Sequence, residues 1–136
     1  MALERMTILE AEGVSVTEAR PSAPIFAYGT LQGEGMQVST GNQALLLGRF
    51  VTRGVALGMG DKYPCADITF DMSDTAYGDG VELCDKSQEA LEHVDEYEGV
   101  NDGYYQRRMI FASPERSHNL FVPMWIYVRG EKLKSE

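Results

Sequence analysis

The stretch "SQEALEHVDEYEG", residues 87–99, is the segment of this 136-residue chain that the sequence most clearly predicts as a long helix. Ser87, or Asp85 just before it, is a favourable N-cap, and Gly99 is a residue type at which helices end. Apolar residues recur between these signals with a helical period. The remaining segments are shorter and favour strands and turns, so the fold is expected to form around this helix.

The faces of the predicted helix separate one acidic residue from the others. At about 100° per residue, Ala90, Leu91, Val94 and Tyr97 form an apolar stripe, and Glu98 lies within about 20° of Leu91. Three other acidic residues lie on the opposite, solvated side: Glu89, Glu92 and Glu96. Glu98 is therefore expected to point with the stripe toward the core.

This position has chemical consequences for Glu98. A carboxylate turned toward apolar neighbours loses hydration, which raises its pKa, and the partial negative charge of a helix C-terminus disfavours the anion further. Such a group is suited to proton transfer near neutral pH. Periodicity alone leaves an alternative open, in which Glu98 lies just past the helix and bends back to water. Asp95 lies at the border of the stripe, where a structural role is open.

Short strands are predicted on both sides of the helix. They are expected at residues 24–31, 49–57, 66–72, 105–112 and 119–130, with a turn leading into a further strand over 77–85. Leu45–Leu47 are expected to close a short helix, and Pro123 indicates a bulge or an edge position. Many short strands around one helix predict an α+β domain with a small curled or closed sheet.

The chain is expected to hold one domain. Residues 24–130 carry the clear patterns, residues 1–23 end in a Ser/Pro cluster and are interpreted as an N-terminal extension or linker, and residues 131–136 are interpreted as a C-terminal tail. The composition, 43% hydrophobic and 24% charged, is sufficient to bury a core.

Charge and hydropathy exclude several classes of partner. A net charge of −9 disfavours nucleic acid and anionic membranes, because both are bound through clustered Lys and Arg. The N-terminus has no apolar signal region and no apolar run reaches about 18 residues, so a cytoplasmic protein is expected. Cys65 and Cys84 lie far apart and, with His93 and His118, do not supply a zinc site, so reduced thiols and no metal are expected.

Two further segments carry candidate chemistry. In "YGTLQGEG", residues 28–35, glycines follow an apolar strand, and the free N–H groups of such a turn can hold a carboxylate or an oxyanion, although a plain tight turn is the alternative. Arg107 and Arg108 point to opposite faces of a strand, so one of them can meet an acidic neighbour or a substrate carboxylate, unless both are solvated. Trp125 and Tyr127 share a strand face, for which core packing is the favoured role.

These pieces form an ordered set of short motifs along the chain: "FAYGTL" at 26–31, "LLGRF" at 46–50, "KYPCA" at 62–66, "GVELCDKSQEALEHVDEYEG" at 80–99, "YYQR" at 104–107 and "MWIYV" at 124–128. In this order they resemble the γ-glutamylcyclotransferase-like proteins, in particular the branch that includes γ-glutamylamine cyclotransferase and AIG2-like proteins. The resemblance covers about residues 24–130. It departs from the family at "QGEGMQ", residues 32–37, and at Cys65, where a small residue is usual.

The resemblance implies a small mixed β-barrel with flanking helices and an enzyme that needs no cofactor. It implies cleavage of a γ-glutamyl amine or γ-glutamyl amino acid to 5-oxoproline and a free amine. Glu98 matches the family's acid/base glutamate. The substrate-binding residues assigned on the same basis are Tyr28, Gly29, Thr30, Leu31, Tyr63 and Tyr105.

Two other functions remain as alternatives to a cyclotransferase. One is a non-catalytic protein of the same fold that binds a small anionic metabolite at the Gly29 turn. The other is an acidic protein-interaction domain that uses its N-terminal arm.

Overall fold

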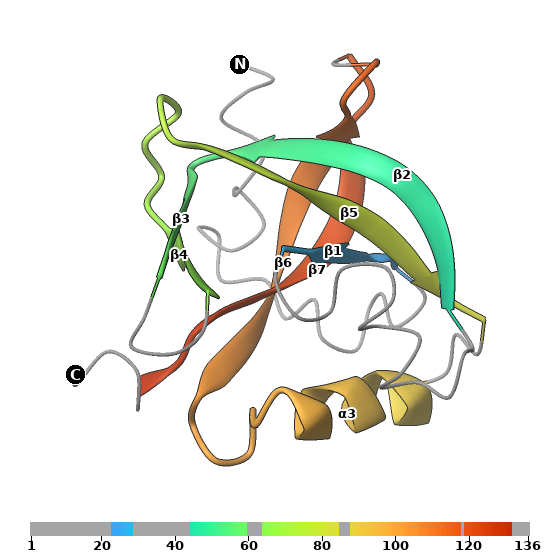
Figure 1. Ribbon diagram of the computed structural model, residues 1–136, viewed down its shortest axis with the longest axis vertical. Helices are drawn as coiled ribbons and strands as arrows, with labels where there is room; N and C mark the ends of the chain where they lie inside the picture. The colour runs from blue at the N-terminus through green and yellow to red at the C-terminus, as the bar shows by residue number, and fades with distance from the viewer. Residues whose placement is uncertain (1–22, 29–43, 60–63, 85–87, 118, 132–136) are drawn as a thin grey trace.

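The computed structural model describes residues 23–28, 44–59, 64–84, 88–117 and 119–131. Eight helices and strands lie in these ranges (Figure 1), in the following order: β1 Ile25–Ala27, β2 Ala44–Arg53, β3 Val55–Met59, β4 Pro64–Ile68, β5 Thr75–Leu83, α3 Gln88–Tyr97, β6 Tyr105–Pro114 and β7 Val122–Arg129. The mixed α+β class predicted from the sequence is confirmed, and the described part of the chain contains one helix.

Five strands pair in an order that closes on itself, β1-β5-β2-β6-β7. The longest ladders are those of β2 with β5 and of β6 with β7, and both are antiparallel. Two joins in the ring are short. β1 pairs with β7 in parallel only at Ile25 and Trp125, and β2 pairs with β6 at Phe50 and Val51.

A second, two-stranded sheet stands beside this ring. β3 and β4 pair antiparallel from Val55↔Ile68 to Met59↔Pro64 and lie at the left in Figure 1. Gly54, with φ of 79°, separates β3 from β2. The predicted strand over 49–57 is thus divided into two strands that belong to different sheets.

Buried side chains form two clusters because successive residues of a strand point to opposite faces. One cluster takes side chains from all five strands of the ring, including Phe26, Phe50 and Met124, together with Val55 and Ala66 of the small sheet. A Cβ added to Gly80 would lie 2.4 Å from the ring of Phe50 and 3.3 Å from Met124, so these residues converge where β5 has no side chain.

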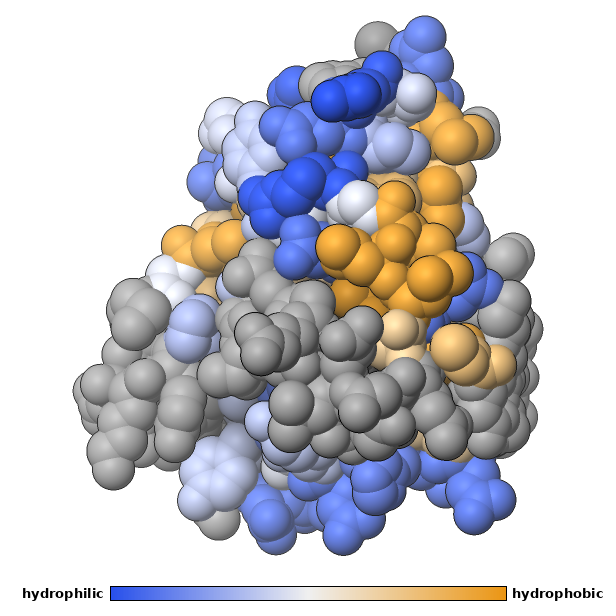
Figure 2. Space-filling view, turned by 45° about the vertical axis from the view of Figure 1, so that its right-hand side comes forward, coloured by the Kyte–Doolittle hydropathy of each residue, from blue (hydrophilic) through white to orange (hydrophobic). Residues whose placement is uncertain are grey.

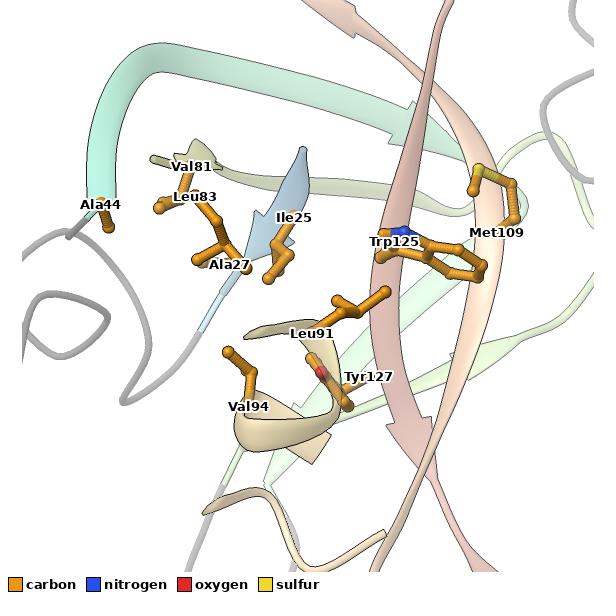
Figure 3. Packing of buried hydrophobic residues seen from close by; sticks show 10 residues of the cluster. All are labelled: Ile25, Ala27, Ala44, Val81, Leu83, Leu91, Val94, Met109, Trp125 and Tyr127. Atoms are coloured by element: carbon orange, nitrogen blue, oxygen red, sulfur yellow. The ribbon is translucent and has the colours of Figure 1, made fainter. Parts of the chain in front are cut away.

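The second cluster joins the sheet to α3. Leu91 and Val94 of the helix are fully buried and pack toward Ile25, Trp125 and Tyr127 (Figure 3). The helix lies along the lower edge of the sheet in Figure 1. It ends where predicted, since Gly99 has φ of 73°, a conformation that favours glycine.

Some local predictions were wrong. Leu45–Leu47 form no helix but belong to β2, whose register shifts between Leu46 and Gly48. The predicted strand over 66–72 ends at Ile68, and Phe70 is exposed with φ of 58°.

The predicted turn at the start of 77–85 is instead the middle of β5. Both of its glycines are buried at points where another residue passes close by. A Cβ on Gly78 would lie 2.7 Å from the backbone oxygen of Ala27, and Gly80 faces the Phe50 ring. These glycines therefore serve close packing and not a change of direction.

Apolar side chains also gather on the surface. Figure 2, which brings the right-hand side of Figure 1 forward, shows a cluster of hydrophobic residues. The right-hand end of β2 in Figure 1 lies on this side. The first leucines of β2, Leu45, Leu46 and Leu47, are all exposed. Within the described residues, no helix combines the length and the apolar character needed to span a membrane.

Candidate active site

Glu98 follows the last residue of α3 and extends the helical hydrogen bonding by one residue. Its N–H donates to the carbonyl oxygen of Val94 over 3.0 Å. The residue is partly buried, and this burial raises the pKa of its carboxyl group from 4.5 to about 7. Near neutral pH both the acid and the anion of Glu98 are therefore populated.

Tyr28 lies directly after β1 and interacts with this carboxyl group. Its hydroxyl donates a hydrogen bond to the backbone carbonyl oxygen of Tyr127. Burial is the main cause that raises the pKa of Tyr28, and the nearby Tyr105 and Glu98 raise it further. These electrostatic interactions show that the sheet brings three predicted site residues, Tyr28, Glu98 and Tyr105, close together.

Tyr105 begins β6 and fixes the small sheet to the site. Its hydroxyl donates to the carbonyl oxygen of Pro64, at the start of β4, over 2.9 Å. Cys65, the next residue of β4, is buried and lies close enough to Tyr28 to affect the pKa of Tyr28. Tyr28, which interacts with Glu98, is thus connected to residues of β4, β6 and β7.

Asp95 is the charged residue that the sequence left undecided, and it is buried. Its Oδ1 atom accepts hydrogen bonds from Tyr127 Oη and from Arg107 Nε, each over 2.7 Å. Its Oδ2 atom accepts from Arg107 Nη2 over 2.9 Å. The Asp95 carboxylate therefore joins α3 to both β6 and β7.

Arg107 is held on two sides. Besides its paired hydrogen bonds to Asp95, its guanidinium carbon lies 4.4 Å from the centre of the Trp125 ring. The side chain is only 7% exposed. Of the three alternatives that the sequence left for the arginine pair, an acidic neighbour, a substrate carboxylate or solvation, the acidic neighbour is the observed one for Arg107. Arg108 is exposed and bonds to Gln106.

Four of the predicted site residues lie outside the described residues: Gly29, Thr30, Leu31 and Tyr63. Their roles remain predictions. Tyr97 was placed on the apolar stripe, but it is 52% exposed, so that placement was wrong. In the described ranges, no group of three His, Cys, Asp or Glu side chains could hold a metal ion.

Comparison with known proteins agrees with this geometry. The family model described as gamma-glutamyl cyclotransferase, AIG2-like, matches residues 25–136. The match spans β1 and the Tyr28 that follows it, as well as α3 and Glu98. This chain belongs to that family. The expectation from the sequence motifs is thus confirmed at the level of the family.

Solved structures of similar fold include family members. A gamma-glutamyl cyclotransferase has a TM-score of 0.66 at 17% identity, over 79% of this chain and 66% of that protein. An AIG2-like protein from Mus musculus has a TM-score of 0.61 at 18% identity, over 82% of each chain. An uncharacterized protein from Homo sapiens has a TM-score of 0.66 at 17% identity, over 80% of this chain and 67% of that one. A search of curated protein sequences finds no match.

At such identities the likeness to these structures establishes the shared fold alone. Family and fold together support a function of the cyclotransferase type. This chain spans about two thirds of the length of the gamma-glutamyl cyclotransferase that it matches.

Proposed function

We propose that this protein releases 5-oxoproline and a free amine from a γ-glutamyl amine or a γ-glutamyl amino acid, with Glu98 as the general acid and base. The observation that carries the proposal is the partly buried carboxyl group of Glu98, whose pKa is raised to about 7. Following the resemblance of the sequence motifs, Glu98 is assigned to the position of the family's acid/base glutamate.

The proposed reaction needs no nucleophile from the protein. The α-amine nitrogen of the substrate forms a bond to its own γ-carbonyl carbon, and the bond from that carbon to the amine portion breaks. Closing a five-membered ring within one molecule has a high effective molarity once the chain is correctly folded. The protein must therefore hold the substrate in a bent conformation and move protons.

Glu98 is suited to both proton transfers. In its anionic form it accepts a proton from the α-ammonium group, and in its acid form it donates one to the departing nitrogen. Protons balance overall, because the released amine leaves as an ammonium ion. A carboxyl group with a pKa near 7 supplies both forms at neutral pH, whereas a solvated glutamate supplies almost only the anion.

The tyrosines around Glu98 are proposed to shape the pocket for the glutamyl end of the substrate. Tyr28 and Tyr105 are fixed by hydrogen bonds to backbone carbonyl oxygens, so their rings form walls that do not depend on the substrate. Following the family resemblance, the backbone N–H groups of Gly29, Thr30 and Leu31 are proposed to hold the substrate carboxylate or the oxyanion.

The test compares wild-type protein with Glu98→Gln on a panel of γ-glutamyl amines and γ-glutamyl amino acids, with 5-oxoproline as the measured product. A β-aspartyl amide serves as the substrate control, because its cyclisation would require a four-membered ring. Glu98→Gln is expected to lower kcat by about 100- to 10,000-fold. Glu96→Gln is the control variant on the exposed side of α3, and it should retain full turnover.

Two outcomes would contradict the proposal. A folded Glu98→Gln variant with wild-type turnover would remove the role assigned to Glu98. Thermal stabilisation of the wild-type protein by γ-glutamyl compounds without any 5-oxoproline would instead identify a binding protein of the same fold.

A further inference from the structure

The residues next to Glu98 include a buried cation that the proposed reaction does not use. Arg107 shares the acceptor Asp95 Oδ1 with the phenol of Tyr127, whose pKa Glu98 also affects. A positive charge this close would normally stabilise a carboxylate and hold its pKa low. The acid/base role of Glu98 requires the opposite.

The anion that pairs with Arg107 is Asp95. Asp95 lies on α3, three residues before Glu98, which continues the helical hydrogen bonding, and this spacing makes their side chains neighbours. Both of its oxygens bond Arg107, at 2.7 and 2.9 Å, in a paired geometry that is specific to arginine and carboxylate. The charge of Arg107 is thereby matched within the ion pair.

The same carboxylate also fixes the geometry of the site. Tyr127 donates its hydroxyl proton to Asp95, and the backbone carbonyl of Tyr127 accepts the hydroxyl proton of Tyr28. Through these two bonds, the helix that carries Glu98 and the strand end that carries Tyr28 are tied to one residue of β7. A change at Asp95 affects both walls of the site.

We propose that Asp95 is a positioning residue for Glu98, which neutralises the buried charge of Arg107 and fixes the last turn of α3 against β6 and β7. This inference rests on the proposed function for its catalytic meaning. It goes beyond that function because it assigns a role to an ion pair that does not take part in the proton transfers.

The other groups that face Glu98 do not account for the same effect. Burial is the cause that raises the Glu98 pKa. Glu98 interacts with the phenols of Tyr28 and Tyr127, and Tyr28 in turn interacts with Tyr105 and Cys65. The pKa values of Tyr28 and Tyr127 are raised, so these phenols are neutral near pH 7. Arg129, at the end of β7, pairs with Asp67 over 3.1 Å. Charge control at neutral pH is therefore assigned to the Asp95–Arg107 pair.

The test measures the titration of Glu98 directly by carbon NMR of glutamate-labelled protein without substrate, with Glu98→Gln used to assign the signal. Asp95→Asn leaves the Arg107 charge unmatched and should lower the Glu98 pKa by about one unit. Arg107→Gln leaves the Asp95 charge unmatched and should raise it by a similar amount. Glu96→Gln, on the exposed side of the helix, should move it by much less.

Shifts of the Glu98 pKa in opposite directions distinguish charge control from structural disruption, which would shift the Glu98 pKa of both variants in the same direction. Shifts of the same sign, or no shift in either folded variant, would overturn the proposal. The double variant Asp95→Asn/Arg107→Gln removes both charges and covers the case in which a single variant does not fold. It should titrate within about half a unit of wild type, and a larger shift would also overturn the proposal.

The inference and the proposed function fail separately, because this titration requires no turnover. Opposite shifts in a protein that releases no 5-oxoproline would support the role of Asp95 and contradict the enzyme. Turnover that depends on Glu98, combined with Glu98 pKa shifts of the same sign in both variants, would support the enzyme and contradict the role of Asp95.

Discussion

Tyr127 Oη donates a hydrogen bond of 2.7 Å to Asp95 Oδ1 and so connects the last strand of the ring to the helix that carries Glu98. Tyr127 is 3% exposed and Asp95 is 9% exposed, so this bond lies in the protein interior. A buried polar network of this kind is sensitive to the loss of any one member, because an unpaired buried polar group is costly. The predictions below depend on that network and on the glycines around it.

The stability of the protein should depend on pH through Glu98. Its pKa is raised from 4.5 to about 7 by burial, so the folded state holds this proton more tightly than the unfolded chain. The stabilisation is complete below about pH 4.5 and is lost as the pH rises through about 7. The effect is on the order of 3 kcal/mol at most.

Urea unfolding of wild-type protein and Glu98→Gln at pH 5 and pH 8 measures this effect. The wild-type protein should lose stability relative to the variant between the two values. A difference that does not change with pH would show that Glu98 titrates normally.

Replacing Asp95 alone should be costly. Asp95→Asn leaves Arg107, which is 7% exposed, as an unmatched buried charge, and breaking such a pair costs about 3–5 kcal/mol. Removing both charges with Asp95→Asn/Arg107→Met should recover much of that loss. Unfolding free energies from denaturant titration provide the measurement, and Glu96→Gln on the exposed face should lie within about 0.5 kcal/mol of wild type. The pairing would be contradicted if the loss of unfolding free energy in the double variant equalled the sum of the losses in the two single variants.

Gly78→Ala should displace β1. The new methyl group would lie 2.7 Å from the backbone oxygen of Ala27 and 2.9 Å from the Phe26 ring, and a backbone atom cannot rotate away. A cost of about 1–3 kcal/mol is expected, together with reduced turnover, because β1 leads into Tyr28. Gly58→Ala is the matched control, since nothing lies within 4 Å of its Cβ position. Equal melting temperatures for the two variants would contradict this account.

Tyr28→Phe should reduce both stability and activity. It removes the hydroxyl that donates to the Tyr127 carbonyl oxygen, and leaving that acceptor unpaired costs about 1–3 kcal/mol. If Tyr28 borders the substrate, kcat/KM for 5-oxoproline release should fall by about 10- to 100-fold. Tyr77→Phe, at an exposed position on β5, controls for the loss of a phenol. Unchanged kinetics in a folded Tyr28→Phe variant would place Tyr28 outside the site.

The sequence predicted the helix and the position of Glu98 but not the role of Asp95. Counted at about 100° per residue, Val94 and Asp95 lie about 60° and 40° to either side of Leu91, and both are buried. Tyr97 lies about 120° away and is exposed. The buried arc is therefore centred on Leu91 and Glu98. A stripe defined by hydrophobic residues alone includes Tyr97 and omits Asp95, so its centre is displaced from that of the buried arc. The sequence alone does not distinguish a buried, paired carboxylate from a solvated one.

The glycines of β5 show a second limit of the sequence. "YGDG", residues 77–80, has the composition of a turn, yet Gly78 and Gly80 lie in a strand because Phe26 and Phe50 cross them closely. Those contacts join residues that are far apart in the chain, so no local pattern reveals them. The helix predicted at Leu45–Leu47 was wrong for the same reason. This segment pairs with β5, which is distant in the sequence, and that pairing outweighs the local preference of the leucines.

The short join between β1 and β7 has a consequence for how the protein is made. β1 is the first described strand, and in the ring it lies between β5 and β7, the last strand. Tyr28 also depends on the Tyr127 carbonyl for its hydrogen bond. Because synthesis on the ribosome runs from the N-terminus, β1 is made before β7 and has no second neighbour until β7 has left the exit tunnel. Closing the ring is thus a long-range step, and Tyr28, Glu98 and Tyr127 come together only after β7 has been synthesised.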